Sequence, residues 1–157
     1  MPRATRISFP KGYGTAKEVL AWAGVRSRLE EARAYWLVTT RAGGAPHVVP
    51  VDGLWMDDVW YYGGAPDTVH RRTVAQNPRA VMHLADPFQA VIVEGVIRGE
   101  RPSSDLAQRL ADASNTKYAE YGYRNDAAAY ADVLALFPNR VLAWMAFPHD
   151  ATRFDFE

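Results

Sequence analysis

The chain has 157 residues, 48% of them hydrophobic, which is enough for one domain with a single packed core. Lysine plus arginine and aspartate plus glutamate number 18 each, which argues against a general nucleic-acid-binding surface. The lack of cysteine excludes disulfides and thiolate sites and suits a cytoplasmic protein. The apolar runs are shorter than a membrane span, and the basic N-terminus has no signal-peptide core, so we expect no membrane segment.

The first part of the chain differs in composition from the rest. Residues 1–14 contain basic side chains, proline and glycine but no acidic residue, which predicts an extended N-terminal arm. Residues 15–157 are then predicted to form a single domain. The motif "TAKE" has the form of a capping box, so we expect a helix to begin at Thr15. Gly24 is expected to interrupt this helix, and helical spacing resumes in "VRSRLEEAR".

Three consecutive antiparallel strands are expected next. "YWLVTT", which begins at Tyr35, is rich in aromatic and β-branched residues, and "RAGGAPH" supplies turn residues before the strand "HVVPVDGLWM". Asp57 and Asp58 make a tight connection into the third strand, "VWYYGG". A short helix follows, and it should end at Asn77 because the residue before a proline is disfavoured in the helical conformation.

Strand and helix signals alternate in the second half of the chain. Strands are predicted at 80–84 and 89–101, and Gly95 and Gly99 would allow a bend or bulge in the longer one. "SSDLAQRLADASNTKYAEY" predicts an amphipathic helix capped by Ser103 or by the serine after it.

The last part of the chain is predicted to hold a second helix in "DAAAYADVLALF", ended near Pro138, and two strands in "RVLAWMAF" and "TRFDFE". Six or seven mostly meandering strands with few inserted helices predict an α+β fold that is mainly β and forms a small antiparallel barrel.

The histidines do not indicate a metal or hydrolytic site. His47, His70, His83 and His149 show no metal-binding spacing, and the chain has neither a nucleophile elbow nor a phosphate-binding loop of the NTPase type. His83 lies in an apolar strand and is interpreted as a partly buried structural histidine. We therefore predict no metal and identify no catalytic side chain from motifs.

The start of the short helix after "VWYYGG" is suited to an anion. A helix N-terminus presents unpaired N–H groups and the positive end of a dipole, and Thr68 and Arg72 would add a hydroxyl and a guanidinium. Gly63 and Gly64 would let a flat ligand approach the backbone. The alternative is that the glycines only turn the chain, Thr68 or Asp67 only caps the helix, and the arginines face water.

Four blocks of the sequence carry a family resemblance. These blocks are "YWLVTTRAGGAPHVVPV", "VWYYGGAPDTVHRRTVAQNPRAVMHL", "QAVIVEGVI" and "VLAWMAFPHDATRFDF". In this order they resemble the pyridoxamine 5′-phosphate oxidase-like family of FMN-binding split barrels, in particular its actinobacterial branch of F420-dependent oxidoreductases. The resemblance covers about residues 13–157. It implies an antiparallel split β-barrel with short helices, a homodimer, and two flavin sites at the subunit interface.

The resemblance also implies which residues contact the cofactor. Beside the flavin ring and ribityl chain would lie the strand residues His47, Val48, Val49 and Pro50. The end of the next strand, Tyr62 and Gly63, would lie near the phosphate-bearing tail, and the helix start would contact the phosphate through Thr68, His70 and Arg72. From the partner subunit the flavin would be reached by Trp144 and Arg153.

Three positions depart from the family pattern. His70 stands where lysine or tryptophan is common, Thr73 where asparagine is common, and Asp52 where the oxidase has a basic residue at the end of its second strand. We therefore predict negligible oxidation of pyridoxamine phosphate and a preference for flat, weakly charged substrates such as an enone or quinone. Asp52 facing solvent or capping a turn is the alternative interpretation.

The resemblance implies an FMN- or F420-dependent oxidoreductase that acts on a small organic substrate. Because hydride moves to or from the cofactor, such a protein needs no catalytic triad. The alternative is a non-catalytic protein on the same fold that binds, stores or senses a flavin, F420 or haem. The longer anionic tail of F420 would need further cations, and the candidates are Arg3, Arg6, Lys11, Lys17 and Arg41. The alternative is that these side chains are solvated and bind no ligand.

Overall fold

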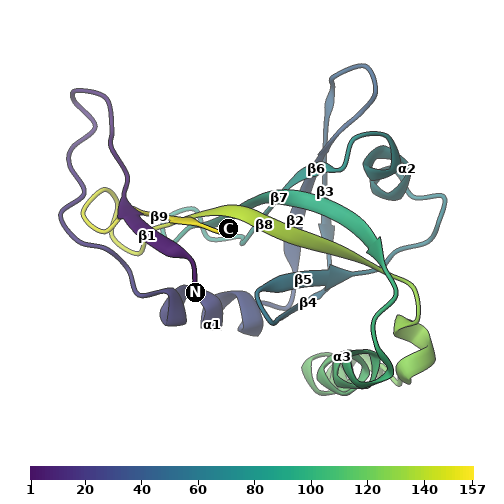
Figure 1. Ribbon diagram of the computed structural model, residues 1–157. Coiled ribbons are helices and arrows are strands. Elements are labelled where there is room, and N and C mark those ends of the chain that lie inside the picture. The colour runs from purple at the N-terminus through teal and green to yellow at the C-terminus, as the bar shows by residue number, and fades with distance from the viewer.

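A computed structural model describes residues 1–157, and a nine-stranded sheet dominates it (Figure 1). The strands are β1 (Arg3–Arg6), β2 (Tyr35–Thr40), β3 (Pro46–Val51), β4 (Leu54–Met56), β5 (Val59–Tyr62), β6 (Arg79–His83), β7 (Val91–Glu100), β8 (Val133–Ala143) and β9 (Thr152–Asp155). The helices are α1 (Trp22–Glu31), α2 (Val69–Gln76) and α3 (Ser104–Lys117), with 3₁₀ turns η1 (Ala119–Tyr121) and η2 (Ala127–Tyr130). None of the helices has the length and apolar character needed to cross a membrane.

The sheet is antiparallel throughout and does not close. Its main order is β1-β9-β8-β7-β6-β2-β3, and β5 pairs with both β4 and β8. Helices α2 and α3 lie at one end of the molecule, and β1, β9 and the loop before β9 lie at the other (Figure 1). The predicted α+β, mainly β, split-barrel fold with short helices is confirmed.

The N-terminal segment contributes the edge strand of the sheet. Arg3–Arg6 pairs antiparallel with β9, with Thr5 opposite Arg153. The guanidinium of Arg3 also lies 3.8 Å from the carboxylate of Asp155. Part of the extended arm is therefore held in the sheet.

The helix expected at Thr15 does not form there, because tertiary contacts hold that segment extended. The amides of Lys17 and Glu18 both donate to the carbonyl oxygen of His149, at 2.7 and 3.1 Å. These amides are thus unavailable for helical hydrogen bonds. Helix α1 begins only at Trp22 and runs through Gly24, which does not interrupt it.

The strand predicted as "HVVPVDGLWM" is two strands, β3 and β4, which pair with different partners. Between them the amide of Gly53 donates to the hydroxyl of Tyr118 at 2.9 Å, so it is not available to a neighbouring strand. The tight turn from β4 to β5 is confirmed, since Asp57 and Asp58 have φ of 53° and 59°, the left-handed conformation that such hairpins require.

The helix predicted over "DAAAYADVLALF" is wrong beyond its first turn. Only η2 is helical, and β8 begins at Val133 because this apolar run pairs with β7 on one side and β5 on the other. A strand buried on both faces reads as a continuous apolar run, which resembles a helix in sequence. Pro138 lies inside β8 opposite Gly95, where the β7–β8 register shifts, and a proline is tolerated at such a bulge.

Strand β5 separates two hydrophobic clusters. Trp60 and Tyr62 point into the larger cluster, which fills the barrel, while Tyr61 points into a smaller cluster under α3. The alternation of side chains along a strand accounts for this division. Helix α3 is capped as expected, because the Ser103 hydroxyl accepts from the amide of Leu106 at 3.2 Å.

We expect Gly95→Ala to destabilise the fold strongly, because the added Cβ would collide with the backbone carbonyl oxygen of Phe137. Overpacking against backbone costs about 2–3 kcal/mol, measurable by urea denaturation. Gly99→Ala is the matched control, since nothing lies within 4 Å of a Cβ at that position on the same strand. Equal stabilities of the two variants would contradict the β7–β8 register.

Candidate functional site

The connection from β5 to α2 depends on two glycines. Gly64 has φ of +127°, and a Cβ there would lie 2.8 Å from Cε1 of His70, so both the conformation and the space favour glycine. A Cβ at Gly63 would meet nothing within 4 Å. The backbone therefore passes tightly over His70 at Gly64 and is open to approach at Gly63.

The N-terminus of α2 has no side-chain cap. Thr68 occupies the cap position, but its hydroxyl donates to the carbonyl oxygen of Ala65 at 2.8 Å, and no acidic residue lies in the first turn. The structure therefore does not show the alternative in which the side chain of Thr68 or Asp67 caps the helix. The positive end of the helix dipole is left without an anionic partner.

Two arginines of α2 turn back onto the connecting loop. Arg71 donates from Nη1 to the carbonyl oxygen of Gly64 at 3.2 Å, and Arg72 donates from Nη1 to that of Asp67 at 2.9 Å. Both acceptors are neutral, so an anion would be a stronger partner for either guanidinium. The sequence prediction named Arg72 but not Arg71, although the helical spacing places both on the first turn.

His70 lies inside the molecule. Its side chain is 5% exposed, its ring packs against Tyr62 with the ring centres 5.7 Å apart, and its Nδ1 has no hydrogen-bond partner. Burial, with smaller effects of His47 and Arg71, holds the pKa of His70 below its ordinary value. His70 is therefore a neutral ring that packs beneath the loop. Burial raises the pKa of the Tyr62 hydroxyl, which has no hydrogen-bond partner either, so this group is also neutral.

The four predicted residues of β3 do not share one side of the sheet. His47 and Val49 are half-buried, whereas Val48 and Pro50 are exposed, as the two-residue period of a strand requires. Helix α2 packs against β2 and β3, and His47 influences the pKa of His70. His47 is therefore near the α2 site, and Nη2 of Arg41 lies 3.4 Å from its Nδ1.

The two C-terminal residues lie far from α2 within one chain. Trp144 donates from Nε1 to the carbonyl oxygen of Pro87 at 3.2 Å and packs against Phe147. Arg153 in β9 pairs with Asp155 at 2.9 Å. Arg153 is part of β9, and Trp144 directly follows the end of β8 that pairs with β9, the strand that lies at the end of the molecule opposite α2 (Figure 1). A single chain therefore does not bring them to the helix start.

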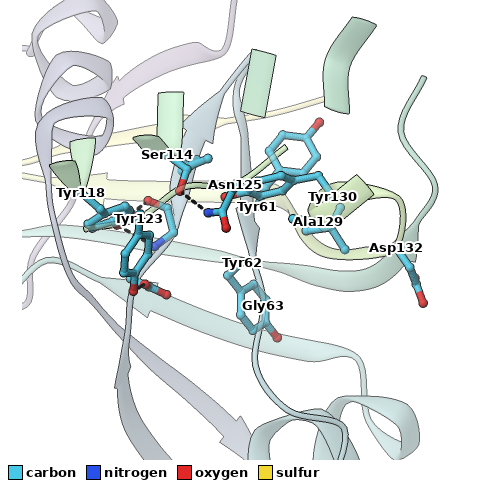
Figure 2. A pocket seen from close by; sticks show the side chains of 14 residues that line it. Tyr61, Tyr62, Gly63, Ser114, Tyr118, Tyr123, Asn125, Ala129, Tyr130 and Asp132 are labelled. Carbon is cyan, nitrogen blue, oxygen red and sulfur yellow. Dashed lines mark hydrogen bonds between the residues drawn. The ribbon is translucent and has the colours of Figure 1, made fainter. Parts of the chain in front are cut away.

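A cavity of about 210 Å³ begins on the other side of the β5 end (Figure 2). Tyr62 and Gly63 form its border with the α2 loop, and residues of α3 and η2, with the tyrosines on either side of η1, form the opposite wall. Asp52 lines this cavity, where its Oδ2 accepts from the hydroxyl of Tyr123 at 2.6 Å. Neither alternative for Asp52, facing only solvent or capping a turn, describes this contact.

Sequence reasoning missed the cavity, although a cluster of tyrosines in "KYAEYGYRNDAAAY" marks one of its walls. Burial raises the pKa of Tyr118 to about 12, so this phenol is neutral at neutral pH. Burial also lowers the pKa of Lys117 to about 8, and its ammonium is held by the carbonyl oxygen of Ala32 at 2.9 Å and the Tyr35 hydroxyl at 3.2 Å.

The comparisons with known proteins agree on the fold. A family model described as pyridoxamine 5′-phosphate oxidase matches residues 22–145. A solved structure named F420 reductase is 20% identical over 85% of this chain and 98% of its own, with a TM-score of 0.57. Protein Rv2991 of Mycobacterium tuberculosis, described as conserved and hypothetical, is 17% identical over 82% and 87%, with a TM-score of 0.68.

A haem-binding protein from Mycobacterium smegmatis is also similar, at 21% identity over 85% of this chain and 58% of its own, with a TM-score of 0.61. No curated protein matches the sequence. At these identities the likeness between structures establishes the fold, and it leaves the ligand to be argued from the site.

We expect the stability of the fold to fall in mild acid because of His70. Folding lowers the pKa of His70. Between about pH 7 and pH 5 the unfolded chain therefore binds a proton at this position more readily than the folded protein does. The free energy of unfolding should decrease as the pH falls below the ordinary histidine pKa of about 6.5. His70→Gln should lose less stability over this range in urea denaturation. An unchanged profile in His70→Gln would contradict the assignment.

Proposed function

The chain belongs to the pyridoxamine 5′-phosphate oxidase family, and from this premise we propose that it is an oxidoreductase that uses FMN or the deazaflavin F420 on a small organic substrate. One observation carries the proposal. The start of α2 has no side-chain cap and no acidic residue in its first turn, although Asp67 precedes the cap position, and it carries a hydroxyl and two guanidiniums paired only with neutral carbonyls. These are the groups that a phosphate requires at a helix N-terminus.

The residues present fit a phosphorylated cofactor. Thr68, Arg71 and Arg72 would hold the phosphate, each exchanging a loop carbonyl for a charged oxygen. The backbone at Gly63 is open, because nothing lies within 4 Å of the position that a Cβ would occupy there. His70 and Gly64, packed against each other, fix the loop whose conformation sets the positions of these donors.

A bound flavin or deazaflavin would supply hydride transfer, and the chain would supply position and surroundings. The helix start would anchor the phosphate. Tyr62, neutral because burial raises its pKa, and the half-buried side chains of His47 and Val49 would border the rest of the cofactor. No side chain of this set needs to form a covalent bond to the substrate.

The choice between FMN and F420 depends on cations beyond the phosphate site. Arg41 is the best placed of the predicted set, because its guanidinium lies 3.4 Å from the His47 ring, which itself faces α2. Arg3 and Arg6 lie in β1 at the opposite end of the same chain (Figure 1). F420 would therefore use Arg41 for its anionic tail, whereas FMN would not require it.

A non-catalytic binding protein for a flavin or haem is the second candidate, favoured by His83. Its Nδ1 lies 2.8 Å from the Leu84 carbonyl oxygen, and in the tautomer that donates from Nδ1 the Nε2 lone pair is free for a haem iron. A structural neighbour is named for haem binding. The absorption spectrum and mass of the copurifying ligand, followed by titration with FMN, F420 and haemin, separate the two candidates. Haemin binding without FMN or F420 binding would overturn the leading proposal.

We expect Arg72→Ala to weaken FMN or F420 binding by about 1.5–3 kcal/mol, or roughly 10- to 150-fold in Kd, because it removes a charge-assisted hydrogen bond to the phosphate. Thr68→Ala should cost about 1 kcal/mol. Fluorescence titration measures both. Arg101→Ala, an exposed arginine outside the site, is the control. If Arg72→Ala retains the parent affinity, the α2 start is not the phosphate site.

We expect a homodimer formed through the outward face of β3, β2 and β6. Trp36 lies opposite Pro50 and His83, and its side chain is 38% exposed, which leaves an apolar row without cover. Light scattering at micromolar concentration should give twice the mass of the chain, and Trp36→Glu should give a monomer. Val19→Glu, which alters an exposed apolar residue outside this face, should remain dimeric. A monomeric parent protein would refute this expectation.

We expect negligible turnover of pyridoxamine phosphate, because Asp52 would face a phosphorylated substrate where the related oxidase has a basic residue. The reduced cofactor should instead pass hydride to a small quinone such as menadione. Steady-state assays of both substrates with the reconstituted protein measure the difference. Efficient oxidation of pyridoxamine phosphate is the result that would contradict this expectation.

A further inference from the structure

The cavity beside β5 is small and walled by phenol rings. Its volume of about 210 Å³ equals roughly seven water molecules at about 30 Å³ each, so it suits one aromatic ring with a short side chain rather than a drug-sized ligand. Five tyrosines line it, together with Leu54 and Val133 (Tyr61, Tyr62, Tyr118, Tyr123 and Tyr130; Figure 2). The ring of Tyr62 itself points into the barrel, where it stacks on Trp60. Ring faces of this kind bind flat aromatic groups and cations.

The charges that line the cavity have one sign. Asp52 and Asp132 are both exposed and both contribute to the lining, whereas no lysine, arginine or histidine does. Two basic side chains on neighbouring segments, Lys117 and Arg124, donate instead to the backbone carbonyls of Gly53 and Tyr123. The rim of the cavity is therefore acidic, and a phosphate or carboxylate would be repelled there.

The polar groups of the wall are already held in place. The hydroxyl of Tyr118 accepts from the Gly53 amide at 2.9 Å, and the hydroxyl of Tyr123 donates to Asp52 Oδ2 at 2.6 Å. Asp52 has no ion-pair partner, and its Oδ1 has no hydrogen-bond donor within the chain. The carboxylate is thus oriented by a phenol while one oxygen remains available to a ligand.

We propose that this cavity binds a small aromatic molecule that bears a positive charge, such as a primary amine on a short chain, with its ring among the tyrosines and its ammonium at the carboxylate of Asp52. The cavity meets the α2 loop at Tyr62 and Gly63, which places its ligand next to the proposed cofactor. Its place beside the cofactor rests on the proposed function, and its ligand is distinct from the flat, weakly charged hydride acceptor expected above. Ligand binding itself requires no cofactor.

Three probes that share one ring test the sign of the charge. Tyramine carries an ammonium, p-cresol is neutral, and 3-(4-hydroxyphenyl)propionate carries a carboxylate. Titration of the full chain without cofactor, followed by calorimetry or ligand-observed NMR, should give the tightest binding for tyramine, by about tenfold over p-cresol, and the weakest for the carboxylate. Equal binding of the three probes, or tighter binding of the carboxylate, would overturn the proposal.

Isosteric variants locate the ammonium. Asp52→Asn keeps an acceptor for the Tyr123 hydroxyl and should weaken tyramine binding about fivefold, as expected for a carboxylate at an exposed rim. Asp132→Asn should have a smaller effect, because the Asp132 carboxylate points away from the tyrosine rings (Figure 2). Affinity for p-cresol should not change, which shows that the cavity remains folded. Asp112→Asn, on α3 outside the cavity, is the matched control. Unchanged tyramine affinity in Asp52→Asn would refute the proposal, whatever the outcome of the FMN and F420 titrations.

Discussion

Strand β5 is buried on both faces, and this constraint organises the rest of the molecule. Because Trp60 and Tyr62 pack into the barrel while Tyr61 packs under α3, the strand cannot slip by one residue without exchanging the two clusters. Its pairing with β8 fixes the same register from the edge, with Tyr61 opposite Ala135. The end of β5 is thus held in three directions. Both the start of α2 and the tyrosine-lined cavity begin at that end.

The two sites that meet there have opposite charge. On the α2 side, the helix dipole, Arg71 and Arg72 present positive charge, and burial keeps His70 neutral so that its ring can pack beneath Gly64. On the cavity side, Asp52 and Asp132 are the charged residues of the lining. Only residues Tyr62 and Gly63 separate them. An anionic cofactor tail and a cationic ring would each find a complementary field, and neither would compete for the other's site.

Local signals in the sequence predicted the parts of this arrangement that depend on neighbours in the chain. The end of α2 at Asn77, the cap at Ser103 and the irregularity at Gly95 each follow from a few consecutive residues. The capping box at Thr15 failed because a carbonyl more than one hundred residues away binds the amides that a helix would need. The cavity escaped notice for the same reason, since Tyr123 reaches Asp52 across 71 positions.

The position of the C-terminal residues bears on how many chains a complete site requires. Trp144 and Arg153 are anchored to Pro87 and Asp155, in and beside the part of the sheet that contains β9, away from α2. In the proposed homodimer a partner subunit would have to supply these two residues to the cofactor, and a two-fold axis would repeat the contact. If these residues contact the cofactor, one partner subunit would do two things. It would cover the exposed surface around Trp36, and it would supply Trp144 and Arg153 to a cofactor bound at α2 of the other subunit.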